Sequence, residues 1–228
     1  MRTQRLAFRG CILILLWIVP GVAGAQTSAR YPLADNQLWE FGVWGAEAMG
    51  KQESEGFGET QITMAGFQIS RVVYERRMET GKRTLEYTFE AQPLFLVTRR
   101  KAAYGGGFSP VGLKLNFVPR GRYRPYLEFN GGGMFTQKNV PPGPTSMFNF
   151  TLAAGPGVMI GLPHNQAMSI ALRFWHLSNA NLGDSNPAFN TIQIVIGYHW
   201  LRAGRTNGKM AAKPSTGGDA GTNPTARQ

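Results

Sequence analysis

The sequence has very little cysteine, few histidines and no long apolar run. Its 228 residues include one cysteine, Cys11, and three histidines. The apolar stretch from Cys11 to Val19 is too short to cross a membrane as a helix. No convincing amphipathic helix follows it. These shortages leave little room for a cysteine framework or for a helical membrane protein.

The first 25 residues predict a secretory signal peptide. Arg2, Arg5 and Arg9 precede the apolar stretch, and Ala23-Gly24-Ala25 is a small-residue cleavage signal. A short membrane anchor is the alternative. Removing residues 1–25 takes away the single thiol, which excludes disulfides, cysteine ligands and cysteine catalysis in the mature chain.

Acidic residues are also scarce, because 24 Lys and Arg face 13 Asp and Glu, a formal net charge of +11. Without the leader and its three arginines the net charge is about +8. An exported chain does not meet nucleic acid as its first partner. Its charge favours an anionic membrane surface or anionic lipid headgroups, with general solubility as the alternative.

The mature length predicts one domain. Residues 203–228 are rich in Gly, Ala, Thr, Asn and Lys without apolar periodicity, and they predict a disordered C-terminal tail. The folded domain is expected within residues 26–202, with its structured part beginning near residue 34.

Period-two alternation of apolar with polar or small residues recurs throughout this domain and predicts eight strands of about ten residues each. The alternating segments are 39–43, 65–70, 85–92, 111–117, 126–130, 148–153, 168–174 and 191–199.

The alternation fits a membrane barrel better than a soluble sandwich, because the polar face carries charges of both signs. These are Glu40, Glu86, Glu90, Glu128, Lys114 and Arg173. The last segment ends in Tyr198-His199-Trp200, which is similar to the terminal aromatic strand of bacterial outer-membrane barrels. The predicted fold is therefore all-β, an eight-stranded antiparallel outer-membrane β-barrel. A soluble lipocalin-like barrel is the alternative.

An even barrel with both ends in the periplasm fixes the direction of every strand. The turns near 75–83, 119–124 and 161–166 are then periplasmic, and the loops near 50–60, 99–110, 137–147 and 179–189 face outward. Arg99, Arg100 and Lys101 would lie at the outer rim, where guanidinium and ammonium groups suit lipopolysaccharide phosphates. Ordinary loop charge is an equal alternative.

His176 and Ser178 stand two residues apart at the outer end of the seventh segment. Residues i and i+2 of a strand share a face, so an imidazole can reach the hydroxyl. Counting from Met168 puts both on the lipid-facing side, where polar groups are costly without a use. Asn190 has the matching parity on the eighth segment and can lie opposite His176. A histidine beside a serine is the core of nucleophilic acyl transfer.

His176-Leu177-Ser178-Asn179-Ala180, followed by Asn186-Pro187 and a terminal aromatic strand, resembles the lipid A 3-O-deacylases, the PagL-like family often labelled acyloxyacyl hydrolases. The closest likeness covers residues 173–202. The resemblance implies an eight-stranded barrel in the bacterial outer membrane. It also implies a carboxylic ester hydrolase that releases the 3-O-linked acyl chain of lipid A, with lipopolysaccharide as its partner and no cofactor.

The resemblance makes Ser178 the nucleophile, His176 the general base, and Asn179 a candidate for polarising the carbonyl or shaping the oxyanion site. The best-known members carry a glutamate where this chain has Asn190. An amide can orient the histidine through its oxygen but supplies no charge. Asp184 could substitute, although a turn residue in Gly183-Asp184-Ser185 is the preferred interpretation.

The remaining histidines and glycines have structural interpretations. His164 lies in a Pro-His-Asn turn and is expected in solvent, and His199 is expected in the polar interior. Scattered histidines without an acidic cluster give no metal site. Gly131-Gly132-Gly133 is expected to be a bend or a close contact within the fifth segment.

Three hypotheses follow, namely a serine esterase acting on lipid A, a non-catalytic barrel that keeps the family motif, and a soluble lipid-binding barrel. The sequence leaves a homodimer open.

Overall fold

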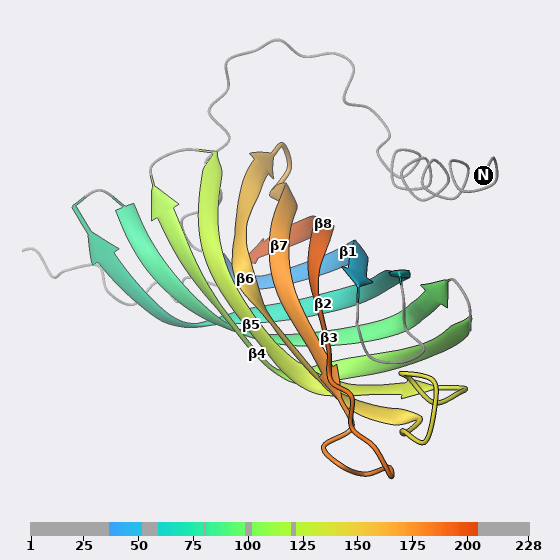
Figure 1. Ribbon diagram of the computed structural model, residues 1–228. Coiled ribbons are helices and arrows are strands. Elements are labelled where there is room, and N and C mark those ends of the chain that lie inside the picture. Colours follow the sequence, from blue (N-terminus) through green and yellow to red (C-terminus); the bar gives the residue numbers. More distant parts are fainter. Residues whose placement is uncertain (1–36, 52–58, 80, 99–101, 120–121, 205–228) are drawn as a thin grey trace, which may run out of the picture.

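The computed structural model describes residues 37–51, 59–79, 81–98, 102–119 and 122–204, and these form one closed barrel of eight antiparallel strands (Figure 1). Consecutive strands pair, and β1 pairs with β8 to close the sheet. The strands are β1 (Gln37–Lys51), β2 (Glu59–Met78), β3 (Gly81–Thr98), β4 (Ala103–Pro119), β5 (Tyr123–Thr136), β6 (Phe148–Leu162), β7 (Gln166–Ser178) and β8 (Phe189–Ala203). The predicted all-β, eight-stranded antiparallel fold is confirmed.

The strands are longer than the predicted ten residues, from 13 in β7 to 20 in β2. The predicted loop near 99–110 is wrong from Ala103 onward, where β4 begins. Gly105 and its two glycine neighbours resemble a turn in sequence, yet they pair with β5. A Cβ on Gly105 would lie 2.1 Å from the Phe135 carbonyl oxygen, so close packing of two strands explains this glycine.

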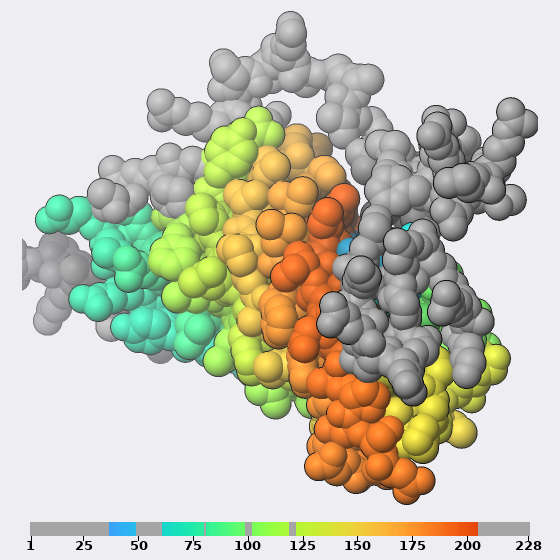
Figure 2. All heavy atoms as spheres, in the orientation of Figure 1, coloured from blue at the N-terminus to red at the C-terminus, as the bar shows by residue number. Residues whose placement is uncertain are grey.

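The two ends of the barrel differ in the length of their connections. One end carries connections 79–80, 120–122 and 163–165, and the other carries 52–58, 99–102, 137–147 and 179–188. Outer-membrane barrels have short periplasmic turns and longer external loops. The end with the long loops is therefore called the outer end. The β5–β6 loop (137–147, yellow) and the β7–β8 loop (179–188, orange) project there beside each other (Figures 1 and 2).

Some predictions concern residues outside this description. The predicted signal peptide, residues 1–25, and the predicted tail beyond residue 204 lie outside the described residues. β8 ends at Ala203, one residue beyond the predicted end of the domain. No helix among the described residues is long and apolar enough to cross a membrane.

Buried charges fill the middle and the periplasmic half of the barrel interior, as the alternation predicted. Lys114 Nζ lies 2.5 Å from Glu40 and 3.1 Å from Glu86. Arg173 contacts the other two acidic side chains, at 2.8 Å from Glu90 and 2.6 Å from Glu128. An eight-stranded barrel is just wide enough to be filled by side chains, so these pairs form a packed core and no pore.

Toward the outer end most of the large buried side chains of the interior are apolar, which the alternation did not predict. Trp175 packs against Phe95 and Phe189, with ring centroids 6.1 and 6.3 Å away. The other buried apolar side chains of this layer include Trp44, Ile62, Met64, Met134 and Leu177. Alternation predicts a polar inner face, whereas the inward residues of β7 at this height, Trp175 and Leu177, are apolar. Arg173 lies 5.3 Å from the Trp44 ring and joins the charged layer to the apolar one.

The predicted places of His199 and of the glycine triplet are confirmed. His199 Nε2 lies 2.8 Å from the Ser169 hydroxyl, and its Nδ1 lies 3.0 Å from Glu40. A Cβ on Gly132 would lie 2.0 Å from the Phe108 carbonyl oxygen, so this glycine marks a close contact between β4 and β5.

Replacing Arg173 with methionine should lower the free energy of unfolding by about 3–5 kcal/mol, because Glu90 and Glu128 would be left buried without a cation. Guanidinium unfolding in detergent micelles, followed by tryptophan fluorescence, measures this. The control is Arg71→Met, at an exposed arginine 5.3 Å from the Trp39 ring, which should cost about 1 kcal/mol or less. Equal unfolding midpoints for Arg173→Met and the unmodified barrel would contradict the role given to the charged layer.

Candidate functional site

The outer end of β7 presents alternate residues to the interior and to the lipid. Trp175 and Leu177 point inward and are 2% and 1% exposed. Phe174 points outward, and His176 and Ser178 share its parity and are half-buried on the outer surface. Because the inward side chains are locked into the apolar layer, the strand cannot slip by one residue without burying its polar pair.

His176 and Asn190 face each other across the β7–β8 ladder. The His176 Nδ1 and the Asn190 Oδ1 lie 2.7 Å apart. An amide oxygen can only accept, so this hydrogen bond holds the imidazole proton on Nδ1 and leaves Nε2 as the basic nitrogen. The opposition of these two residues, predicted from parity, is therefore present in the structure.

Ser178 lies just beyond the β7–β8 ladder, whose last pair is Leu177 with Phe189. On its other side Ser178 pairs with Phe150 of β6, and His176 pairs with Leu152. Among the described residues the Ser178 hydroxyl makes no hydrogen bond to His176. Catalytic hydrogen bonds often tighten only when substrate is bound. Because their β6 partners Phe150 and Leu152 are apolar, His176 and Ser178 lie beside an apolar surface that faces the acyl chains of the bilayer.

Asn179 directly follows Ser178, and its side chain is buried within the β7–β8 loop. Its Nδ2 donates to the Ser185 carbonyl oxygen at 2.9 Å, and its backbone N–H donates to Asn186 Oδ1 at 3.0 Å. Its Oδ1 accepts from the Asn181 N–H at 3.0 Å. These bonds make Asn179 the organiser of the loop, and a direct contact with substrate stays a prediction.

A tight turn follows Asn179. Ala180 and Asn181 have φ angles of 50° and 64°, and the Leu182 N–H donates to the Asn179 carbonyl oxygen at 3.0 Å. Alanine in the left-handed region is strained, and such strain is often concentrated at functional sites. The turn folds the chain back within two residues of the candidate nucleophile.

The other predicted residues lie apart from this group. Asp184 is exposed in the loop, and His176 is bonded to Asn190, which supports the interpretation of Asp184 as a turn residue. Arg99, Arg100 and Lys101 lie outside the described residues. His164 is exposed in the β6–β7 turn at the periplasmic end, as predicted.

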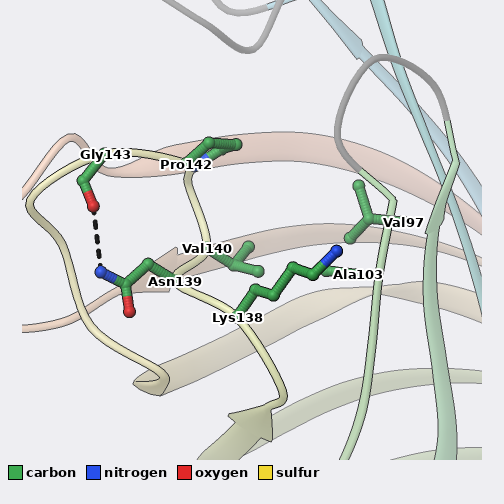
Figure 3. Close-up of a pocket in the computed structure, with 7 residues that line it drawn as sticks. All are labelled: Val97, Ala103, Lys138, Asn139, Val140, Pro142 and Gly143. Atoms are coloured by element: carbon green, nitrogen blue, oxygen red, sulfur yellow. Dashed lines mark hydrogen bonds between the residues drawn. The ribbon is translucent and has the colours of Figure 1, made fainter.

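A cavity of about 200 Å³ lies beneath the β5–β6 loop, away from His176 and Ser178 (Figure 3). Its lining residues are Val97, Ala103, Lys138, Asn139, Val140, Pro142 and Gly143. Lys138 extends along it toward Ala103, and the other walls are mainly apolar. The candidate catalytic group is instead a surface site, for which the bilayer would supply the missing wall.

The sequence did not reveal the contact through which the β5–β6 loop supports the β7–β8 loop. Ser185 N–H donates to the Pro144 carbonyl oxygen at 2.9 Å, which joins the β7–β8 loop to the β5–β6 loop. The only sequence signal near it is the Asn186-Pro187 pair, which resembles the family but does not reveal that Asn186 caps the Asn179 amide.

Comparison with known proteins settles the family. A family model described as lipid A 3-O-deacylase (PagL) matches residues 24–199. The chain belongs to the lipid A 3-O-deacylase family. Membership places it in the bacterial outer membrane and associates it with deacylation of lipid A, as the resemblance implied.

Two solved structures match the chain at low sequence identity. The outer membrane enzyme PagL, in a crystal structure, is 15% identical, with a TM-score of 0.49, over 68% of this chain and 97% of that chain. The outer membrane protein AlkL, solved by solid-state NMR in lipid bilayers, is 12% identical, with a TM-score of 0.38, over 82% of this chain and 98% of that chain. No curated protein sequence matches the chain significantly.

The outward parity of the deacylase motif can be tested with single cysteines carrying nitroxide labels. Oxygen collects in the bilayer, so labels at Phe174→Cys and His176→Cys should show high oxygen accessibility by electron paramagnetic resonance. Leu177→Cys should show low accessibility, because its side chain is buried in the barrel. High accessibility at position 177 with low accessibility at 174 and 176 would place His176 and Ser178 inside the barrel and contradict their lipid-facing position.

Proposed function

We propose that this protein is a serine esterase that hydrolyses the 3-O-linked acyl ester of lipid A in the outer leaflet of the outer membrane. The observation that carries the proposal is the 2.7 Å bond between His176 Nδ1 and Asn190 Oδ1, with Ser178 two residues further along the same lipid-facing side. Few reasons other than chemistry explain a histidine, a serine and an asparagine together on the lipid face of a barrel.

In the first step the Ser178 hydroxyl attacks the carbonyl carbon of the ester. His176 Nε2 takes the hydroxyl proton, and Asn190 holds the ring so that Nε2 is the free base. The tetrahedral intermediate collapses when the bond to the sugar oxygen breaks. The protonated His176 then gives its proton to that oxygen, which leaves as the free 3-hydroxyl group of the sugar.

In the second step water attacks the acyl-serine. His176 removes a proton from the water, the bond to Ser178 breaks, and the proton passes to the serine oxygen. The released product is the 3-hydroxyacyl acid, and the enzyme returns to its starting state. No cofactor takes part in this sequence.

Asn179 serves the reaction by shaping the segment after the nucleophile. Its backbone N–H and that of Asn181 are both engaged within the loop. Because these N–H groups already have acceptors, neither is free to bind an oxyanion, and we assign Asn179 the role of organising the turn after the nucleophile.

The substrate class follows from the surroundings of the group. Phe150, Leu152 and Phe174 are 45%, 40% and 46% exposed beside it and face acyl chains. A lipid anchored in the leaflet would bring its ester to Ser178 without entering a pocket. Arg99, Arg100 and Lys101, in the connection after β3, are proposed to contact its phosphates.

The chain ends are part of the proposal. Residues 1–25 would direct export and be removed. Residues 203–228 would form a tail that the ester chemistry does not need, although the first of them, Ala203, belongs to β8.

The alternative function is a non-catalytic barrel, and Asn190 is the feature that favours it, because an amide cannot stabilise the imidazolium by charge.

Expression in a host without this activity should remove one 3-hydroxyacyl chain from lipid A, measured by mass spectrometry. Ser178→Ala should abolish the change, with a loss of rate of about 10³-fold or more because the nucleophile is gone. Heat-modifiable gel mobility controls for folding. Unchanged lipid A in the presence of a folded wild-type barrel would contradict the proposed function.

Variants at Asn190 separate the two candidate functions. In an esterase, Asn190→Ala should slow deacylation about tenfold or more by freeing the imidazole, and Asn190→Glu should accelerate it by adding a carboxylate. Activity that appears only in Asn190→Glu would instead favour the non-catalytic barrel.

A further inference from the structure

Two outer loops that are far apart in the sequence meet at a short backbone contact. Ser185 of the β7–β8 loop donates its N–H to the Pro144 carbonyl oxygen of the β5–β6 loop at 2.9 Å, and its hydroxyl lies 3.3 Å from the same oxygen. Beside this contact, a Cβ added to Gly183 would lie 2.6 Å from the Thr145 carbonyl oxygen. The two loops therefore pack backbone to backbone, and we call this contact the loop clasp.

The loop clasp continues directly to the residue after the candidate nucleophile. The Ser185 carbonyl oxygen accepts from Asn179 Nδ2 at 2.9 Å, and the neighbouring Asn186 accepts from the Asn179 N–H at 3.0 Å. Ser185 is thus bonded to Pro144 through its N–H and to Asn179 through its carbonyl. A single residue, Ser185, therefore connects the β5–β6 loop to the segment that carries the candidate nucleophile.

The β5–β6 loop is itself held in one shape. Val140 N–H donates to the Ser146 carbonyl oxygen at 3.2 Å, and Asn139 Nδ2 donates to the Gly143 carbonyl oxygen at 2.9 Å (Figure 3). Thr145 donates its hydroxyl to the Pro141 carbonyl oxygen. The Val140 side chain is 3% exposed and anchors the loop on the barrel mouth. A loop with this internal bonding can serve as a fixed support.

Ser178 needs such a support because regular pairing with β8 ends before it. The last β7–β8 pair is Leu177 with Phe189, so Ser178 keeps a ladder partner only on the β6 side. A displacement of about 1 Å between reacting groups can cost about 100-fold in rate. His176, one step deeper in the ladder, is fixed by β8, and the position of Ser178 relative to it depends on the loop.

We propose that the β5–β6 loop is a positioning element for the esterase reaction, and that the loop clasp from Pro144 through Ser185 and Asn179 sets the place of Ser178. This inference rests on the proposed function. Pro144 and Ser185 are positioning residues, because they act on Ser178 through Asn179. The loop clasp affects the rate of the chemical step, whereas the apolar outer wall of the barrel binds the lipid.

The test compares two substitutions at Ser185 in the purified, folded barrel. Ser185→Pro removes the N–H donor to Pro144 and keeps the carbonyl that Asn179 uses, whereas Ser185→Ala keeps both. Release of 3-hydroxyacyl chains from lipid A in mixed micelles gives kcat and KM. We expect Ser185→Pro to lower kcat about 10–100-fold with KM little changed, and Ser185→Ala to stay within about twofold of wild type.

A second variant breaks the loop clasp from the other side and avoids proline. Gly183→Ala places a methyl group against the Thr145 backbone and should also lower kcat at unchanged KM. Heat-modifiable mobility should be normal in all three variants, because the loops lie outside the strand ladders.

Full kcat in both Ser185→Pro and Gly183→Ala overturns the positioning role while leaving the esterase intact. Equal losses in Ser185→Pro and Ser185→Ala also overturn it, since the hydroxyl and not the backbone clasp would then matter. A wild-type barrel without turnover is a different result, because it defeats the proposed function itself.

Discussion

Arg173 is the side chain on which the arrangement of the molecule depends. It points into the barrel and contacts Glu90 and Glu128 at 2.8 and 2.6 Å. A slip of one residue would place this guanidinium in lipid and leave two carboxylates unpaired in the core. The buried pairs therefore fix which face of β7 is outward. His176 and Ser178 face the bilayer because Arg173 cannot.

The barrel interior and the membrane have different roles at the candidate site. The apolar layer around Trp175 fills the outer end of the barrel with buried side chains, so β7 is held firmly beneath its two polar residues. In the proposed reaction the candidate catalytic group needs no cavity, because the bilayer would present the acyl ester beside it. The outer loops add a third support, where Ser185 joins the turn after Ser178 to the β5–β6 loop.

Much of this could be predicted from the sequence, because strand alternation is a local property. The parity of His176, Ser178 and Asn190 and the inward charges all follow from counting by twos. The extension of β4 through Gly105 was missed, because glycines required by close packing resemble turn glycines. The apolar layer was missed because alternation predicts a polar inner face, whereas the inward Trp175 and Leu177 are apolar. The loop clasp joins residues 41 positions apart and has no spacing pattern to reveal it.

The most direct measurement is mass spectrometry of the purified barrel after reaction with a lipid-soluble fluorophosphonate, which captures an activated serine. One adduct is expected, on the peptide that carries Ser178. In His176→Ala it should form at least about 100-fold more slowly, because the hydroxyl loses its base. An adduct on another serine, or equal labelling of Ser178 in wild type and His176→Ala, would contradict the assignment of Ser178 as nucleophile and His176 as its base.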